Sequence, residues 1–213
     1  MSFRYLIWDA DGTLLDTYPV IDRSILKSLE MLGQTCPLDE ISKLGKVSLT
    51  HCMSTLSQKY GVDQDELLRL HGENYLSFSL EEQPPFDGVV RICERIVAGG
   101  GQNFIVTHRG RESLEQLLTF HGMSDLFTER VAKDDDYPRK PDPAAFLAVI
   151  EKYGLPREKT LGVGDRDLDI LGAQNAGIAA CFFGDASVLP ESAVPEYVVE
   201  DYRELEAILF PPD

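Results

Sequence analysis

Residues 3–16 read FRYLIWDADGTLLD, and this stretch decides how the rest of the chain is interpreted. Phe3–Trp8 is a bulky apolar run with one basic interruption, as is typical of a strand buried on both faces. Asp9, Asp11 and Gly12 follow directly, so two acids leave a buried strand in a tight turn, where only solvent, a cation or a ligand could partner them. An ordinary polar turn explains this motif at least as well when it stands alone. An EF-hand loop would need a third ligand before the glycine.

The composition indicates a folded, acidic protein. With 213 residues, 43% of them hydrophobic, the chain can form one large domain or a domain with an insertion. The formal net charge of −16 disfavours nucleic acid and anionic membranes as partners. No apolar run reaches the ~20 residues of a membrane span, and the N-terminal residues lack signal-peptide features. We therefore expect a cytoplasmic, soluble protein, monomeric, with reduced thiols because the four cysteines show no disulfide or zinc spacing.

The segment after the opening turn predicts helices and no strand. Apolar residues recur at helical spacing within 21–32, 49–60 and 65–78, and Pro84-Pro85 favours an extended connector. We therefore predict a helical cap domain over 17–83, inserted into a core domain formed by 1–16 and 84–213. The hinge of this cap is expected where Leu14–Tyr18 meets Gln83–Phe86.

Beyond residue 84 the pattern alternates between helices and short apolar strands. Helices are predicted at 88–98, at 111–121, after an N-cap at Asp142 with Pro143 in the first turn, and at 168–176. Strands are predicted at 103–107, 160–164 and 178–183. This alternation predicts an α/β fold, a Rossmann-like parallel sheet with helices on both faces, plus the inserted all-helical cap.

Polar side chains follow the ends of these strands. Thr107 ends the second strand, Asp165 directly follows a later one, Asp169 lies one turn into the next helix, and Lys140 precedes a helix. Right-handed crossovers bring the carboxyl ends of parallel strands to one edge, so these groups should meet Asp9 and Asp11.

Such a cluster of acids requires a cation. Two carboxylates ~4 Å apart repel by about 4 kcal/mol at an effective dielectric near 20. Lys140 supplies one positive charge, too little for four acids. An oxygen-only pocket with two or three acids suits Mg²⁺, which keeps waters and takes further ligands from substrate phosphate.

The ordered motifs resemble those of the haloacid dehalogenase superfamily. They are DADGTL at 9–14, Thr107 after an apolar strand, KPDP at 140–143 and GDRDLD at 164–169. The helical insertion looks like the cap of the phosphoglycolate phosphatase and beta-phosphoglucomutase branch. This resemblance covers the Rossmann-like part of the chain, and four motifs in order make it specific.

The resemblance implies catalytic roles for four residues. Asp9 would be the nucleophile that forms an aspartyl-phosphate. Asp11 would protonate the leaving alcohol and then deprotonate the attacking water. Thr107 would donate its hydroxyl to the phosphoryl oxygens, and Lys140 would neutralise nucleophile and phosphate.

The resemblance also implies metal and substrate ligands. Asp9, Asp165 and the backbone carbonyl of Asp11 would hold Mg²⁺, and Asp169 would bind or orient it. Asp167 is interpreted as an ordinary acid at a helix N-terminus. The further candidates for substrate binding near these motifs are Gly12, Thr13, His108 and Arg109. The family more often has Asn or Ser directly after the threonine, so whether His108 faces the substrate or packs against the cap hinge stays open.

In this branch the cap presents residues that select the substrate. The segment KLGKVSLTH at 43–51, predicted to be a loop between cap helices, offers Lys43, Lys46, Ser48, Thr50 and His51. It contains no arginine to grip a second phosphate, which disfavours a mutase.

These observations favour a Mg²⁺-dependent phosphatase that acts on a small phosphorylated metabolite. A phosphomutase is the first alternative. A 2-haloacid dehalogenase is disfavoured because it would not need Asp11. A non-catalytic module that binds phosphate or a partner on the same fold is the alternative from another class, and the intact motifs argue against it.

Overall fold

The structure is a computed structural model that describes residues 2–211. The chain divides into two compact units. The α/β unit runs up to Leu15 and resumes at Pro85, and the helical unit is Asp16–Pro84. The predicted cap, 17–83, differs from the helical unit by one residue at each end. The predicted hinge segments lie side by side, since Phe86 N donates to Leu14 O over 3.1 Å and Asp16 N to Pro84 O over 2.8 Å.

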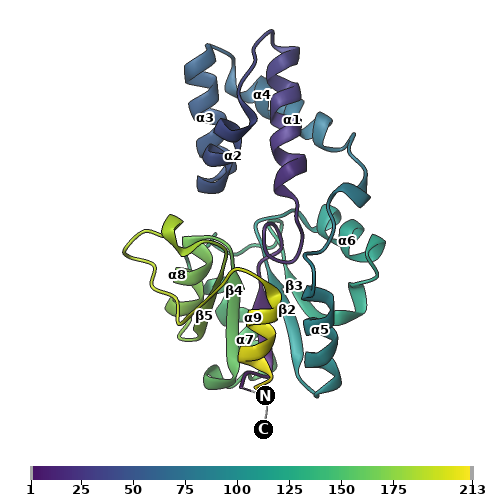
Figure 1. The fold of residues 1–213 in the computed structure, drawn as a ribbon, viewed down its shortest axis with the longest axis vertical. Helices are drawn as coiled ribbons and strands as arrows, with labels where there is room; N and C mark the ends of the chain where they lie inside the picture. Colours follow the sequence, from purple (N-terminus) through teal and green to yellow (C-terminus); the bar gives the residue numbers. More distant parts are fainter. Residues whose placement is uncertain (1, 212–213) are drawn as a thin grey trace. The chain divides into compact units, whose positions relative to one another are not determined.

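The α/β unit contains a six-stranded parallel sheet, which confirms the predicted fold class (Figure 1). The strand order is β3-β2-β1-β4-β5-β6. The strands are β1 (Tyr5–Trp8), β2 (Gln102–Val106), β3 (Phe127–Val131), β4 (Thr160–Gly164), β5 (Ala179–Phe183) and β6 (Tyr197–Val199). Strand β1 lies between β2 and β4, and Leu6, Ile7 and Trp8 are fully buried.

Helices cover both faces of the sheet. They are α5 (Val89–Ala98), α6 (Arg111–Phe120), α7 (Ala144–Tyr153), α8 (Asp167–Asn175) and α9 (Tyr202–Leu209). Short 3₁₀ turns occur at Leu80–Glu82, Ser124–Leu126, Arg157–Lys159 and Ala186–Val188. Helix α7 begins one residue later than predicted: Pro143 is its N-cap, and the carboxylate of Asp142 accepts a hydrogen bond from Ala144 N over 2.9 Å.

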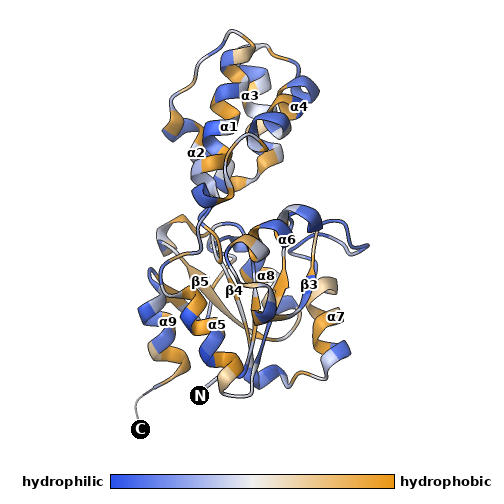
Figure 2. Ribbon diagram, turned by 90° about the vertical axis from the view of Figure 1, so that its right-hand side faces the viewer, coloured by the Kyte–Doolittle hydropathy of each residue, from blue (hydrophilic) through white to orange (hydrophobic). Residues whose placement is uncertain are grey.

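Each face of the sheet has its own core. On one face Ile7 and Phe104 pack with Phe146 of α7 and Ile170 of α8. On the other face lie α5 and α9, as three polar contacts indicate. Trp8 donates from Nε1 to Asn103 Oδ1 over 3.2 Å, Asn103 donates to the α5 carbonyl of Cys93 over 3.0 Å, and Tyr202 of α9 donates to the Thr13 carbonyl over 2.5 Å. Strand β5 is hydrophobic along its length (Figure 2).

The helical unit contains α1 (Tyr18–Met31), α2 (Leu38–Val47), α3 (Leu49–Tyr60) and α4 (Gln64–Tyr75). Each helix carries both hydrophilic and hydrophobic residues (Figure 2). The prediction of a loop at 43–51 is wrong, because this segment is the end of α2 and the start of α3. Only Ser48 separates the two helices, and its hydroxyl caps α3 by accepting from His51 N over 3.0 Å.

The described residues include no helix that has both the length and the apolar character of a membrane span. All four cysteines are buried free thiols.

A buried histidine joins α1 to α4. His71 Nδ1 lies 2.7 Å from Ser24 Oγ, and the Ser24 hydroxyl donates to the Ile21 carbonyl over 2.7 Å. Because the single hydroxyl proton of Ser24 is used by Ile21, His71 donates from Nδ1. Burial lowers the pKa of His71 to about 4.

Because His71 is buried and its pKa is lowered, we expect the protein to lose stability in mild acid. As the pH falls below the unfolded-state pKa of ~6.5, the unfolded chain binds the proton before the folded chain does. The free energy of unfolding should therefore fall between pH 6.5 and about 4, by roughly 3 kcal/mol at most, and His71 should contribute no pH dependence above 6.5. Urea unfolding at pH 7.5, 6 and 5 measures this. The difference between the wild type and His71→Gln should shrink in acid, whereas exposed His51→Gln should track the wild type; a constant difference for His71→Gln would contradict the assignment.

Candidate active site

The predicted catalytic acids begin at the end of the central strand. Asp9 directly follows β1, donates its backbone N–H to Val163 O over 2.9 Å and is 3% exposed. The chain then turns sharply at Gly12, whose φ of 78° lies in the left-handed region that favours glycine. Leu15 N returns to Ala10 O over 2.9 Å, which closes the turn around Asp11.

Lys140 is a buried cation in contact with two acids. Its Nζ lies 2.5 Å from Asp9 Oδ1 and 2.6 Å from Asp169 Oδ1, and it donates to the Val106 carbonyl over 2.8 Å. Burial disfavours the ammonium, but Asp169 and then Asp9 outweigh it, so the pKa of Lys140 is raised. Lys140 is therefore charged at neutral pH and neutralises part of the acidic cluster.

The second oxygen of Asp9 has no such partner. Asp9 Oδ2 is buried and makes no hydrogen bond to the described residues. Burial raises the pKa of Asp9 to about 6, an effect that Lys140 opposes and Asp169 reinforces. A buried carboxylate oxygen without a donor is costly, and a bound cation or an electrophile would remove that cost.

Three acids converge at this site. One carboxylate oxygen each from Asp9, Asp165 and Asp169 lie within 4.8 Å of one another. Asp165 accepts from Thr13 Oγ1 over 3.2 Å, and Asp169 Oδ2 accepts from Arg166 N over 3.1 Å. A hard, oxygen-only donor set with an unsatisfied buried oxygen fits Mg²⁺.

A glycine makes room for Asp169. A Cβ on Gly164, the last residue of β4, would lie 2.2 Å from the Asp169 Cβ. No side chain fits there, so the glycine lets the first turn of α8 pack against the strand. The position of Asp169 thus depends on Gly164.

The tripeptide Thr107-His108-Arg109, directly after β2, contacts several parts of the site. Thr107 is buried and its Oγ1 accepts from Arg109 N over 3.1 Å. His108 accepts from Lys140 N through Nε2 over 3.0 Å. Arg109 donates to Asp11 Oδ1 from Nε over 2.9 Å and from Nη2 over 2.5 Å, and to Ser113 Oγ over 2.6 Å.

The pairing of Arg109 with Asp11 adds a cation that sequence reasoning did not assign to the acids. From the sequence we predict that Arg109 binds substrate, and that Lys140 is the only side chain whose positive charge offsets the carboxylates. In the structure Arg109 is 8% exposed and neutralises Asp11. The arginine two residues after the strand-end threonine was the signal available in the sequence.

The structure thus brings the candidate site residues of the four sequence motifs together in the α/β unit, Gly12 and Thr13 included. The candidates from the segment 43–51 lie in the helical unit. Lys43 and Lys46 are exposed on α2, and the Lys43 ammonium lies 3.3 Å from Asp39. Thr50 and His51 are exposed on the first turn of α3. Their role in substrate selection stays a prediction.

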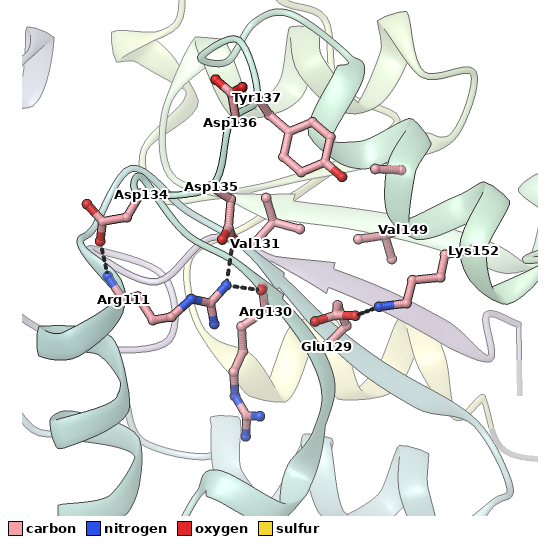
Figure 3. Close-up of a pocket in the computed structure, with 11 residues that line it drawn as sticks. Arg111, Glu129, Arg130, Val131, Asp134, Asp135, Asp136, Tyr137, Val149 and Lys152 are labelled. Carbon is pink, nitrogen blue, oxygen red and sulfur yellow. Dashed lines mark hydrogen bonds and ion pairs between the residues drawn. The ribbon is translucent and has the colours of Figure 1, made fainter.

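A cleft of about 550 Å³ lies elsewhere, along edge strand β3 (Figure 3). Four of its charged side chains form two ion pairs. Arg111 contacts Asp135 over 2.6 Å and donates to the Arg130 carbonyl over 2.9 Å, and Lys152 pairs with Glu129. None of the predicted catalytic residues lines this cleft, so the strand-end cluster remains the candidate active site.

Fold and site together define an α/β enzyme with a carboxylate centre and a helical insertion after its first strand. The sequence model described as haloacid dehalogenase-like hydrolase matches residues 6–183, and the chain belongs to this family. The resemblance inferred from the motifs is thereby confirmed.

The relatives match over nearly their whole length. A protein named Pyrophosphatase PpaX from Halalkalibacterium halodurans is 29% identical, with 96% of each chain covered. A phosphoglycolate phosphatase from Aliivibrio fischeri is 28% identical, covering 98% of this chain and 97% of its own. The crystal structure of a predicted phosphoglycolate phosphatase from Haemophilus somnus has a TM-score of 0.85 at 21% identity, covers 98% of each chain, and supports the fold alone.

Proposed function

We propose that this chain is a Mg²⁺-dependent phosphatase that hydrolyses a small phosphorylated metabolite through a covalent intermediate on Asp9. The observation that carries the proposal is the state of Asp9. One oxygen is held by Lys140, while the other is buried and has no hydrogen-bond partner among residues 2–211, and the carboxylate as a whole clusters with those of Asp165 and Asp169. The names of the relatives, a pyrophosphatase and a phosphoglycolate phosphatase, support phosphoryl compounds as the substrate class.

In the proposed reaction, the Asp9 carboxylate attacks phosphorus and the bond from phosphorus to the leaving oxygen breaks. Asp11, which has turned away from Arg109 and taken up a proton from solvent, gives that proton to the leaving oxygen. Water then attacks the aspartyl-phosphate and gives its proton to Asp11. The bond to Asp9 breaks, and inorganic phosphate leaves. Lys140 and the hydroxyl of Thr107 stabilise the negative charge on the phosphoryl oxygens.

Asp9, Asp165 and the carbonyl of Asp11 would hold Mg²⁺, with Asp169 beside them. When bound, the ion neutralises charge on the phosphoryl group and on the carboxylates. Asp169 already binds Lys140 and the Arg166 amide, so its task is to fix the lysine and the loop that carries Asp165.

Arg109 affects the proton transfer. Because Arg109 contacts both Asp11 oxygens in the structure, Asp11 must turn away from it to reach a leaving oxygen. The released guanidinium would carry a positive charge toward the substrate, in line with its predicted binding role.

A panel of ~50 to 100 phosphorylated metabolites, including pyrophosphate and phosphoglycolate, tests the function through kcat/KM. Phosphate release from a subset of small compounds is expected. Hydrolysis in ¹⁸O-labelled water should place the label in the phosphate, whereas transfer to another sugar hydroxyl without label would favour the mutase. If no compound is hydrolysed with Mg²⁺ present, the proposal is wrong.

Removal of the metal should abolish activity and lower stability. EDTA should stop phosphate release, and added Mg²⁺ should restore it. Mg²⁺ in excess of its Kd should raise the melting temperature of the wild type, because it binds the folded chain. Asp165→Asn should lose this shift, whereas Asp167→Asn, two residues away, should keep it. An equal shift in both variants would place the ion elsewhere.

A further inference from the structure

His108 contacts the segment that carries the catalytic lysine. Its Nε2 lies 3.0 Å from Lys140 N, and the backbone amide is the donor. The imidazole nitrogen must therefore offer a lone pair, so the ring is neutral and its proton sits on Nδ1. The nitrogen that accepts from Lys140 cannot at the same time accept a hydrogen bond from a substrate.

Lys140 lies in the irregular connection between β3 and α7. The Lys140 ammonium must nevertheless reach Asp9 and Asp169 within 2.6 Å, with 1% of its side chain exposed. In a helix or strand a backbone carbonyl would fix such an amide. Here the side chain of His108, just after the end of β2, accepts the hydrogen bond from the Lys140 amide instead.

We propose that His108 is a positioning residue, whose imidazole fixes the backbone of Lys140 and thereby holds the lysine ammonium between Asp9 and Asp169. Thr107 and Arg109 flank it, so consecutive residues hold separate parts of the site. Arg109 holds Asp11 of the β1 turn, and His108 holds the lysine segment. Both alternatives for His108, substrate contact and packing against the hinge, are replaced by this role.

The surroundings of His108 favour the neutral ring that the contact needs. Burial comes first, followed by the positive charges of Lys140, Arg166 and Arg139, against which Asp169 acts weakly. Together they lower the pKa of His108 to about 4. The acceptor lone pair is thus present throughout the neutral range.

Two measurements on the folded protein test the inference without any substrate, so their outcomes do not depend on the proposed function. Imidazole ¹⁵N spectra of the wild type at pH 7 should show Nδ1 protonated and Nε2 unprotonated. Hydrogen exchange at the Lys140 amide should be at least tenfold faster in His108→Leu and in His108→Asn, whose side-chain oxygen is too short to accept. His108→Gln should keep the amide protected, because its Oε1 reaches about as far as Nε2.

Kinetics add a rescue test. His108→Leu should lower kcat/KM of the order of 10²-fold, as expected when a catalytic group is misplaced by about 1 Å, and His108→Gln should restore most of it. His121→Leu, a histidine at the end of α6, serves as the control and should alter neither exchange nor activity.

A ring with its proton on Nε2, or unchanged Lys140 exchange in His108→Leu, would overturn the proposal. So would a Gln variant that protects the amide yet is as inactive as the Leu variant, since His108 would then act on the substrate. If His108→Leu does not fold, the wild-type tautomer and the Asn and Gln pair decide.

Discussion

Asp9→Asn should lower kcat by about 10⁴-fold or more, the size of loss seen when a covalent nucleophile is removed. The amide cannot attack phosphorus, but its Oδ1 still accepts from Lys140, which keeps the lysine in place. The substitution also removes a buried charge whose pKa is raised to about 6, so the fold should survive. Phosphate release and near-UV circular dichroism of the purified variant measure the two effects.

Asp167→Asn is the matched control for this variant. Asp167 belongs to the same motif as Asp165 and Asp169, but its Oδ1 accepts from Leu168 N over 2.8 Å at the start of α8. Its activity should stay within a few-fold of the wild type. If Asp9→Asn kept more than a tenth of the wild-type rate, Asp9 would not be the nucleophile.

Lys140→Met should have the largest effect on stability. Without the ammonium, Asp9 and Asp169 remain buried with no cation between them, and losing one partner of such a cluster costs about 3–5 kcal/mol. Activity should also fall, by about 10²- to 10³-fold, because a buried charge that stabilises the phosphoryl group is missing. Urea unfolding in the absence of Mg²⁺ and kcat/KM in its presence measure these losses.

The loss of stability in Lys140→Met should depend on pH. The pKa of Asp9 is already raised in the wild type and should rise further without Lys140. A carboxyl whose pKa is raised by folding costs stability increasingly as the pH climbs above its unfolded value of ~3.9. The destabilisation should therefore be larger at pH 8 than at pH 5. Lys152→Met, which breaks an exposed ion pair with Glu129, should cost at most about 1 kcal/mol, and an equal cost for both variants would refute the buried cluster.

The centre of the fold was predictable because its strands are predominantly apolar runs followed by polar residues. Phe3–Trp8, 103–107 and 160–164 place Asp9, Thr107 and Asp165 at one edge by topology alone. The edge strands were not predicted. In β3 only Phe127 and Val131 at its two ends are apolar, and β6 has three residues, so neither shows a strand pattern.

Long-range pairs in the site could not be predicted for a different reason. Arg109 and Asp11 lie 98 residues apart, and His108 and Lys140 lie 32 apart, so no local pattern records either contact. The C-terminal part of α2 was not predicted as helix because Gly45 and the nearby lysines are typical of a loop, although Ile41 and Leu44 keep helical spacing. Local chemistry identified the reacting groups, and only the tertiary structure revealed what holds them.

The order of the strands also governs how the site is made during synthesis. Strand β1 leaves the ribosome first, yet Tyr5 pairs with Gln102 on one side and Thr160 on the other. The helical unit is complete in the emerging chain before β2 or β4 has been synthesised. It can therefore fold while β1 still has no strand to pair with. The strand that precedes Asp9 is therefore translated before both of its neighbours and enclosed only after them, and a nascent chain that ends before Asp169 cannot have an assembled active site.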